Sequence, residues 1–147
     1  MKYRLPGVQI IVAMLLFTGA SATLAHQVEE VGDGQYRVIV GFVNEPIYTD
    51  ERNGLDLIIR PADEQEAIPG LEEGLNAELI APDGETRRAF DIRPRYPHPG
   101  RYTFDTVLTE PGHYQVRVWG KIHDVSFDVT FLLDEVKPIS TLHFPKP

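Results

Sequence analysis

Cysteine is absent from all 147 residues of the chain, and methionine is nearly so. The two methionines, Met1 and Met14, both lie within the first 25 residues. Without cysteine the protein cannot be held together by disulfide bonds, so its hydrophobic core alone must stabilise it. A transition-metal site after residue 25 would have to use histidine, carboxylates or a terminal amine, because thiolate and thioether ligands are lacking there.

Basic residues are also scarce: 14 Lys and Arg stand against 22 Asp and Glu. Lys2 and Arg4 belong to the first 25 residues, which contain no acid, so residues 26–147 carry 12 basic and 22 acidic side chains. A surface with this excess of negative charge repels nucleic acid and anionic lipid and attracts cations. We therefore expect no nucleic-acid partner.

Motifs of common enzyme classes are missing as well. The chain has no Gly-x-Ser-x-Gly nucleophile elbow, no His-Glu-x-x-His zinc helix and no phosphate-binding P-loop. Paired acids such as Glu29-Glu30 and Glu72-Glu73 are consecutive, which is typical of a solvated surface rather than of an acid–base pair. The sequence therefore predicts a protein that is not an enzyme.

The N-terminus has the order of an export signal. Lys2 and Arg4 precede an apolar run at 10–17, and small residues follow at 18–25. The run is only eight residues long, whereas a membrane-spanning helix needs about twenty. We expect cleavage after Ala22 or after Ala25, leaving a periplasmic or secreted protein without a membrane span.

Alternating apolar and polar residues recur from residue 27 onward, interrupted by Gly, Pro, Asn and Asp. Alternation with a period of two is typical of half-buried β-strands, and the interruptions supply turn residues. The pattern predicts a short edge strand at 27–31 and strands at 36–43, 54–60, 75–81, 86–93, 101–109, 113–119 and 125–133.

Seven or eight short strands at this spacing predict an all-β fold, namely a two-sheet antiparallel sandwich of the immunoglobulin-like type. In strand 113–119, Tyr114, Val116 and Val118 share one face and are expected in the core. Similar alternation predicts inward rows in 102–108 and 125–131. We expect one domain over 26–134, followed by a proline-punctuated tail over 135–147.

His26 is the first candidate metal ligand, because cleavage after Ala25 would give it a free amine. An N-terminal histidine offers Cu(II) its amine and an imidazole nitrogen in one chelate, which a second imidazole and a carboxylate would complete. Alternate turns of an antiparallel sandwich lie at opposite ends, and the strand count places His113 near His26. The candidate ligands at this end are His26, His113, Asp50 and Glu51, with Glu45 and Asp83 as further carboxylates. The alternative is a frayed N-terminus with a solvated histidine.

A rival group of candidate ligands is predicted at the opposite end of the sandwich. It consists of His98, which lies between two prolines, together with His123 and Asp124. Histidines in surface turns are usually only solvated, and sequence spacing does not establish that they touch. His143, in the tail, is not expected to take part.

Several segments form a familiar pattern: His26, YRVIVGF at 36–42, NEPIY at 44–48, NGLDL at 53–57, PGRY at 99–102, and EPGHY at 110–114 continuing to Phe131. The pattern resembles bacterial secreted immunoglobulin-like domains loosely grouped with the CopC-like copper-handling proteins, and it spans nearly all of 26–147.

The resemblance implies a periplasmic sandwich. In CopC proteins an N-terminal histidine joins a second histidine and an aspartate around Cu(II), and only His26 carries over to this chain. The closing Asp-Gly-His segment of CopC is absent. The expected partner is thus Cu(II) or a similar divalent ion, and the alternative is a structural or protein-interaction module of an envelope complex that binds no metal.

Overall fold

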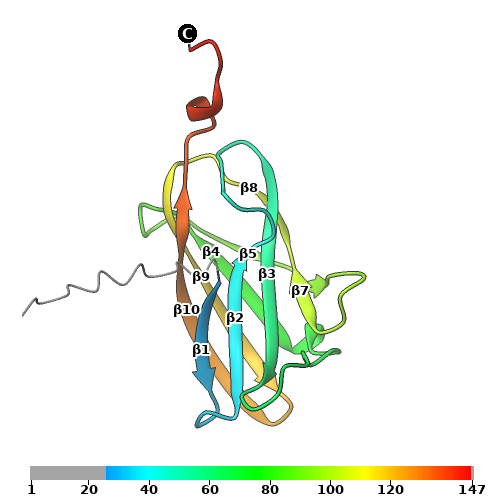
Figure 1. Ribbon diagram of the computed structural model, residues 1–147. Coiled ribbons are helices and arrows are strands. Elements are labelled where there is room, and N and C mark those ends of the chain that lie inside the picture. Colours follow the sequence, from blue (N-terminus) through cyan, green and yellow to red (C-terminus); the bar gives the residue numbers. More distant parts are fainter. Residues whose placement is uncertain (1–25, 147) are drawn as a thin grey trace, which may run out of the picture.

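The computed structural model describes residues 26–146, so the expected signal segment 1–25 lies outside the described residues. Residues 26–146 form ten strands, arranged in two antiparallel sheets (Figure 1). The first sheet contains β1 (Gln27–Val31), β2 (Tyr36–Phe42), β3 (Arg52–Pro61), β6 (Arg93–Pro94), β7 (Arg101–Thr103) and β8 (Asp105–Val107). The second sheet contains β4 (Leu75–Ile80), β5 (Arg87–Phe90), β9 (Gly112–Ile122) and β10 (Val125–Val136). Two short 3-10 helices, η1 (Glu72–Gly74) and η2 (Ile139–Leu142), complete the described chain.

The predicted two-sheet sandwich is confirmed. The strand order is β1-β2-β3-β7-β6 in the first sheet, where β8 also pairs with β3, and β10-β9-β4-β5 in the second. The chain changes sheet between β3 and β4, between β5 and β6, and between β8 and β9. Among residues 26–146, no helix has the length and apolar character needed to cross a bilayer.

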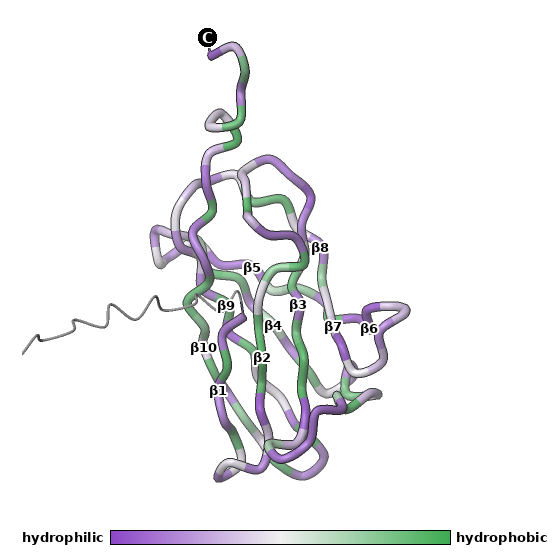
Figure 2. Tube along the Cα trace, viewed as in Figure 1, coloured by the Kyte–Doolittle hydropathy of each residue, from purple (hydrophilic) through white to green (hydrophobic). Residues whose placement is uncertain are grey.

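The core lies between the two sheets, where the inward side chains of both meet. In β9 the predicted row Tyr114, Val116 and Val118 is buried, with polar residues between its members. Facing it are Val38 and Val40 of β2 and Leu55, Leu57 and Ile59 of β3, all fully buried. Figure 2 shows hydrophobic residues along the middle of the long strands and hydrophilic residues at their connections. This core takes the place of disulfide bonds.

Two of the predicted strands are divided in the structure, and three others extend beyond their predicted bounds. The segment 86–93 is two strands in different sheets, because the chain leaves β5 at Phe90 and crosses to the first sheet as β6. The segment 101–109 is interrupted at Phe104, where the Thr103 hydroxyl donates a 2.6 Å hydrogen bond to the carbonyl of Leu55. The last strand, β10, continues to Val136, whereas the tail was predicted to begin at residue 135. Its pairing with β9 shifts register between Leu132 and Glu135.

The connection between β2 and β3 is docked on the end of β10. The amide of Thr49 donates to the carbonyl of Lys137 at 2.9 Å, and the amide of Lys137 donates to the carbonyl of Ile47 at 3.0 Å. The Thr49 hydroxyl also accepts a bond from the amide of Ile139. These bonds hold the β2–β3 connection against the C-terminal end of β10. Carboxylates and histidines from distant parts of the sequence therefore meet at this end of the sandwich.

Replacing Gly120 with alanine should destabilise the fold. Gly120 has φ of 150°, and a Cβ atom there would lie 2.1 Å from the carbonyl oxygen of Gly74. Because both the backbone conformation and the close approach exclude a side chain, we expect Gly120→Ala to lower the free energy of unfolding by about 2–4 kcal/mol. Urea unfolding followed by circular dichroism would measure it.

Gly74→Ala is the matched control, because a Cβ at Gly74 meets only the carbonyl oxygen of Lys121 at 3.6 Å. This variant should change the free energy of unfolding by less than about 1 kcal/mol. Equal losses for the two variants would contradict the explanation.

Candidate functional site

A buried carboxylate on β3 lies at the centre of the candidate site. Asp56 pairs in register with Gly41 of β2, and Val40, the residue before Gly41, pairs with Gln27 of β1. His26 directly precedes β1 and lies over Gly41, where an added Cβ would stand 2.8–2.9 Å from the imidazole ring. Because glycine leaves this space open, Nε2 of His26 reaches to 3.1 Å from Oδ2 of Asp56. The side chain of Asp56 is only 5% exposed.

Two arginines meet the same carboxylate. Nη1 of Arg101, on β7, lies 3.2 Å from Oδ2 of Asp56, and Nη1 of Arg95, in the β6–β7 connection, lies 2.9 Å from Oδ1. The Arg95 contact is an ion pair without hydrogen-bond alignment, so buried Oδ1 has no hydrogen-bond partner in the described part of the chain. A buried carboxylate is stable only when cations or donors compensate it. We call His26, Asp56, Arg95 and Arg101 the Asp56 cluster.

The tautomer of His26 follows from this contact. An ionised carboxylate can only accept hydrogen bonds, so Nε2 of His26 must carry the proton that points to Asp56. In the neutral ring, Nδ1 then has a free lone pair. The side chain of His26 is 33% exposed, which leaves part of the ring open to solvent.

Glu45, in the β2–β3 connection, extends the acidic character of this region. Desolvation by its surroundings raises the pKa of Glu45, and the nearby charges of Asp134 and Asp56 act in the same direction. The amide of Phe42 and the charge of His26 oppose the rise, but the net pKa stays above its usual value. Glu45 is therefore within electrostatic range of His26.

Glu45 also lines an open cavity of about 560 Å³ together with His113. The remaining lining residues are Pro46, Ile47, Asp134, Glu135 and Lys137. The ring of His113 is fixed, because its Nδ1 lies 3.0 Å from the carbonyl oxygen of Leu133. A carbonyl oxygen can only accept, so Nδ1 carries the proton and Nε2 keeps its lone pair. His113 thus has one ring nitrogen held by the protein and the other available.

The other predicted ligands lie apart from this region. Asp50 and Glu51 are exposed in the β2–β3 connection, and Asp50 is tied there by its amide, which donates to the carbonyl of Leu108. His123, in the β9–β10 turn, lies 3.4 Å from the hydroxyl of Tyr36 on β2. His98 lies in the β6–β7 connection, and β3 and β7 separate β6 from β2. The structure gives no contact between His98 and His123 among residues 26–146.

The carboxylate that orients His26 was not found from the sequence. Asp56 stands between leucines in the apolar segment GLDLII, and a charge in such a run is a usable sign of a buried, paired group. Arg95 and Arg101 gave no such sign, because arginines in turns and at strand ends are ordinary. Within residues 26–146, no three His, Asp or Glu side chains converge as a ready metal site.

Removing the charge of Asp56 should cost more stability than removing an exposed carboxylate charge that also meets two arginines. We expect Asp56→Asn to lower the free energy of unfolding by about 2–4 kcal/mol, because two arginines would then lack their counter-ion in a partly buried place. Chemical denaturation at pH 7 would measure this loss.

Asp105 is the control, since it also meets two arginines, Arg52 and Arg93, at 3.0 and 2.8 Å, but its side chain is 45% exposed. Hydrogen bonds from these arginines lower the pKa of Asp105, so its contribution is present at neutral pH and lost as the pH falls through that lowered pKa. At pH 7, Asp105→Asn should cost less than about 1 kcal/mol. A larger loss for Asp105→Asn than for Asp56→Asn would refute the role given to burial.

Comparison with known proteins gives no family assignment: no family model, no curated protein and no solved structure matches the chain. The function must therefore be argued from the residues of the Asp56 cluster and their surroundings.

Proposed function

We propose that the mature protein is an exported, extracytoplasmic protein that binds Cu(II), or a divalent ion of similar preference, at His26. The observation that carries the proposal is the contact of Nε2 of His26 with Asp56 at 3.1 Å. Histidines that bind metals commonly donate their second ring N–H to a carboxylate or carbonyl, which fixes the ring and raises its basicity. His26 has this arrangement.

The chelate would form on the opposite side of the imidazole. Cleavage after Ala25 leaves the free amine of His26 close to its own Nδ1, so the two nitrogens can bind one ion together. Nitrogen ligands of this kind suit Cu(II), which prefers tetragonal sites of nitrogen and oxygen. The amine is a main-chain group, so such a site does not require three converging side chains.

Further ligands are available from the cavity that Glu45 and His113 line. Glu45 offers a carboxylate within electrostatic range of His26, and His113 offers Nε2 because its Nδ1 is held by Leu133. The acidic residues Asp134 and Glu135 add negative charge that attracts a cation. An open cavity of this kind suits uptake and release of an ion rather than its permanent burial.

Asp56 has a positioning role in this proposal, and it is not a ligand. Both of its oxygens already have partners, since the guanidinium groups of Arg95 and Arg101 and Nε2 of His26 lie within 3.2 Å of them. The arginines neutralise the buried carboxylate and would repel a divalent ion placed next to it. Asp56 therefore fixes the ring of His26 while the ion binds on the far side.

The experiment that tests the proposal is the intact mass of the exported protein, measured under gentle ionisation before and after addition of Cu(II). We expect a chain that begins at His26 and keeps one copper ion after excess metal is removed. A chain that begins at Thr23, or one that begins at His26 and keeps no copper, would overturn the proposal. His26→Gln should lose the ion, whereas His143→Gln, in the exposed tail, should keep it.

Gly41→Ala tests whether the orientation of the ring matters. The added methyl group occupies the space of the His26 ring and should displace it from Asp56, while all ligands remain present. We expect the affinity for Cu(II) to fall by about 10–100-fold, as when the groups that hydrogen-bond to metal-binding histidines are removed. Titration calorimetry against a competing chelator would measure it, and an unchanged affinity would exclude the orienting role of Asp56.

A further inference from the structure

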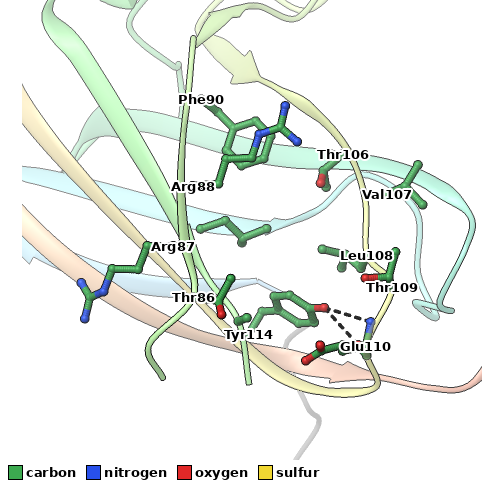
Figure 3. A pocket seen from close by; sticks show the side chains of 12 residues that line it. Thr86, Arg87, Arg88, Phe90, Thr106, Val107, Leu108, Thr109, Glu110 and Tyr114 are labelled. Atoms are coloured by element: carbon green, nitrogen blue, oxygen red, sulfur yellow. Dashed lines mark hydrogen bonds between the residues drawn. The ribbon is translucent and has the colours of Figure 1, made fainter. Parts of the chain in front are cut away.

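A second cavity, of about 220 Å³, opens between the edges of the two sheets (Figure 3). It lies between β5, at the edge of the second sheet, and β8 with the residues that follow it. Its apolar lining comes from Leu79, Phe90, Val107, Leu108 and Tyr114. Typical small-molecule sites occupy about 300–1,000 Å³. The cavity is therefore of a size for one side chain rather than for a cofactor.

The walls of this cavity are fixed by specific contacts. The Tyr114 hydroxyl donates to the carbonyl of Glu110 at 3.1 Å and accepts from the amide of the same residue at 3.2 Å, as Figure 3 shows. On the opposite side, the ring of Phe90 stacks on Phe104 with centroids 4.1 Å apart. A preformed cavity costs little ordering on binding.

β5 presents an unpaired backbone edge next to the cavity. In the described chain β5 pairs with β4 alone. The amide of Ala81 donates to the carbonyl of Thr86 across the turn, so these two residues form a hydrogen-bonded pair. Along an antiparallel ladder, hydrogen-bonded and non-hydrogen-bonded pairs alternate from there. The next pair, Ile80 with Arg87, and the pair Glu78 with Ala89 are therefore non-hydrogen-bonded pairs. In such pairs the backbone N–H and C=O groups point away from the partner strand, so those of Arg87 and Ala89 point away from β4. The edge therefore offers donors and acceptors to another strand.

The two arginines of this edge differ in their surroundings. Arg87 points away from the cavity, as Figure 3 shows, and pairs with Glu78 at 3.2 Å. The guanidinium of Arg88 lies 4.8 Å from the ring centroid of Phe90 and has no acidic partner among residues 26–146. In a protein with so many more acids than bases, Arg88 is a cation left free at the mouth of an apolar cavity.

We propose that β5 is a docking edge for an extended, acidic segment of another protein. Such a segment would add a strand beside β5 and bond to the outward backbone groups of Arg87 and Ala89. Because alternate side chains of a strand share a face, one apolar side chain would enter the cavity, and an acidic side chain two positions away would pair with Arg88. The acidic charge of the partner segment follows from this unpaired arginine.

This edge site is independent of the proposed metal site. It uses β5 and β8, whereas the Asp56 cluster uses β3, β7 and the residue before β1. An inorganic anion could meet Arg88 but would leave the apolar walls and the backbone edge unused. A protein segment uses all three features.

The probe is the peptide acetyl-Thr-Glu-Thr-Phe-Thr-Glu-Thr-amide, which puts phenylalanine and two glutamates on one face of a strand. The control peptide carries lysine in place of both glutamates. Binding is measured by fluorescence anisotropy of labelled peptides and mapped by amide chemical shifts of the mature protein. We expect the acidic peptide to bind at least about tenfold more tightly, and to shift the amides of β5. No saturable binding of the acidic peptide, equal binding of both peptides, or shifts elsewhere would overturn the proposal.

Two variants test the geometry. Arg88→Glu should reverse the preference, so that the lysine peptide binds more tightly than the acidic peptide. Lys121→Glu makes the same charge change on β9, and the acidic peptide should still bind more tightly to this variant. Ala89→Pro removes an outward N–H without touching the ladder to β4 and should weaken binding of the acidic peptide by about tenfold or more. If Ala89→Pro does not fold by circular dichroism, the charge reversal at Arg88 decides, and an unreversed preference overturns the proposal.

Discussion

Asp56 places a negative charge on a strand whose neighbouring side chains are apolar, and a buried charge is stable only where cations meet it. The protein supplies two cations, Arg95 from the β6–β7 connection and Arg101 from β7, and a hydrogen-bond donor, His26, from the residue before β1. The same requirement explains Gly41, since only glycine lets the His26 ring cross β2 to reach Asp56. The need to compensate one carboxylate thus fixes the position of the N-terminal end of the domain.

The site depends on this arrangement because Asp56 determines which nitrogen of His26 is free. The contacts of His26 and His113 follow one pattern, in which one ring nitrogen donates to a protein acceptor and the other keeps its lone pair. The docking of the β2–β3 connection on β10 brings Glu45 to the same end of the sandwich. The free edge of β5 uses a different side of the same sandwich.

Local periodicity was enough to predict most strands, and it failed at two strand breaks, of which only the one after β5 is a change of sheet. The expected strands at 27–31, 36–43 and 75–81 agree with β1, β2 and β4 to within a residue. The segments 86–93 and 101–109 kept their alternation but were divided, at Phe90 and at Phe104. Alternation reports that one face is buried, and it carries no information on which sheet buries it. For the same reason Asp56 was passed over, because its partners come from strands that are distant in sequence.

The sequence by itself determined the class of the fold, because the period of its apolar residues and the spacing of its turn residues allow a sandwich and little else. It also determined the kinds of ligand available, since a chain without cysteine, and without methionine after residue 25, can offer only nitrogen and oxygen donors there. The tertiary structure alone decided that His26, Arg95 and Arg101 meet at Asp56, and that Arg88, beside a cavity, has no acidic partner among residues 26–146. Pairing of strands across long separations sets these contacts, and its energy comes from the whole core rather than from any local pattern.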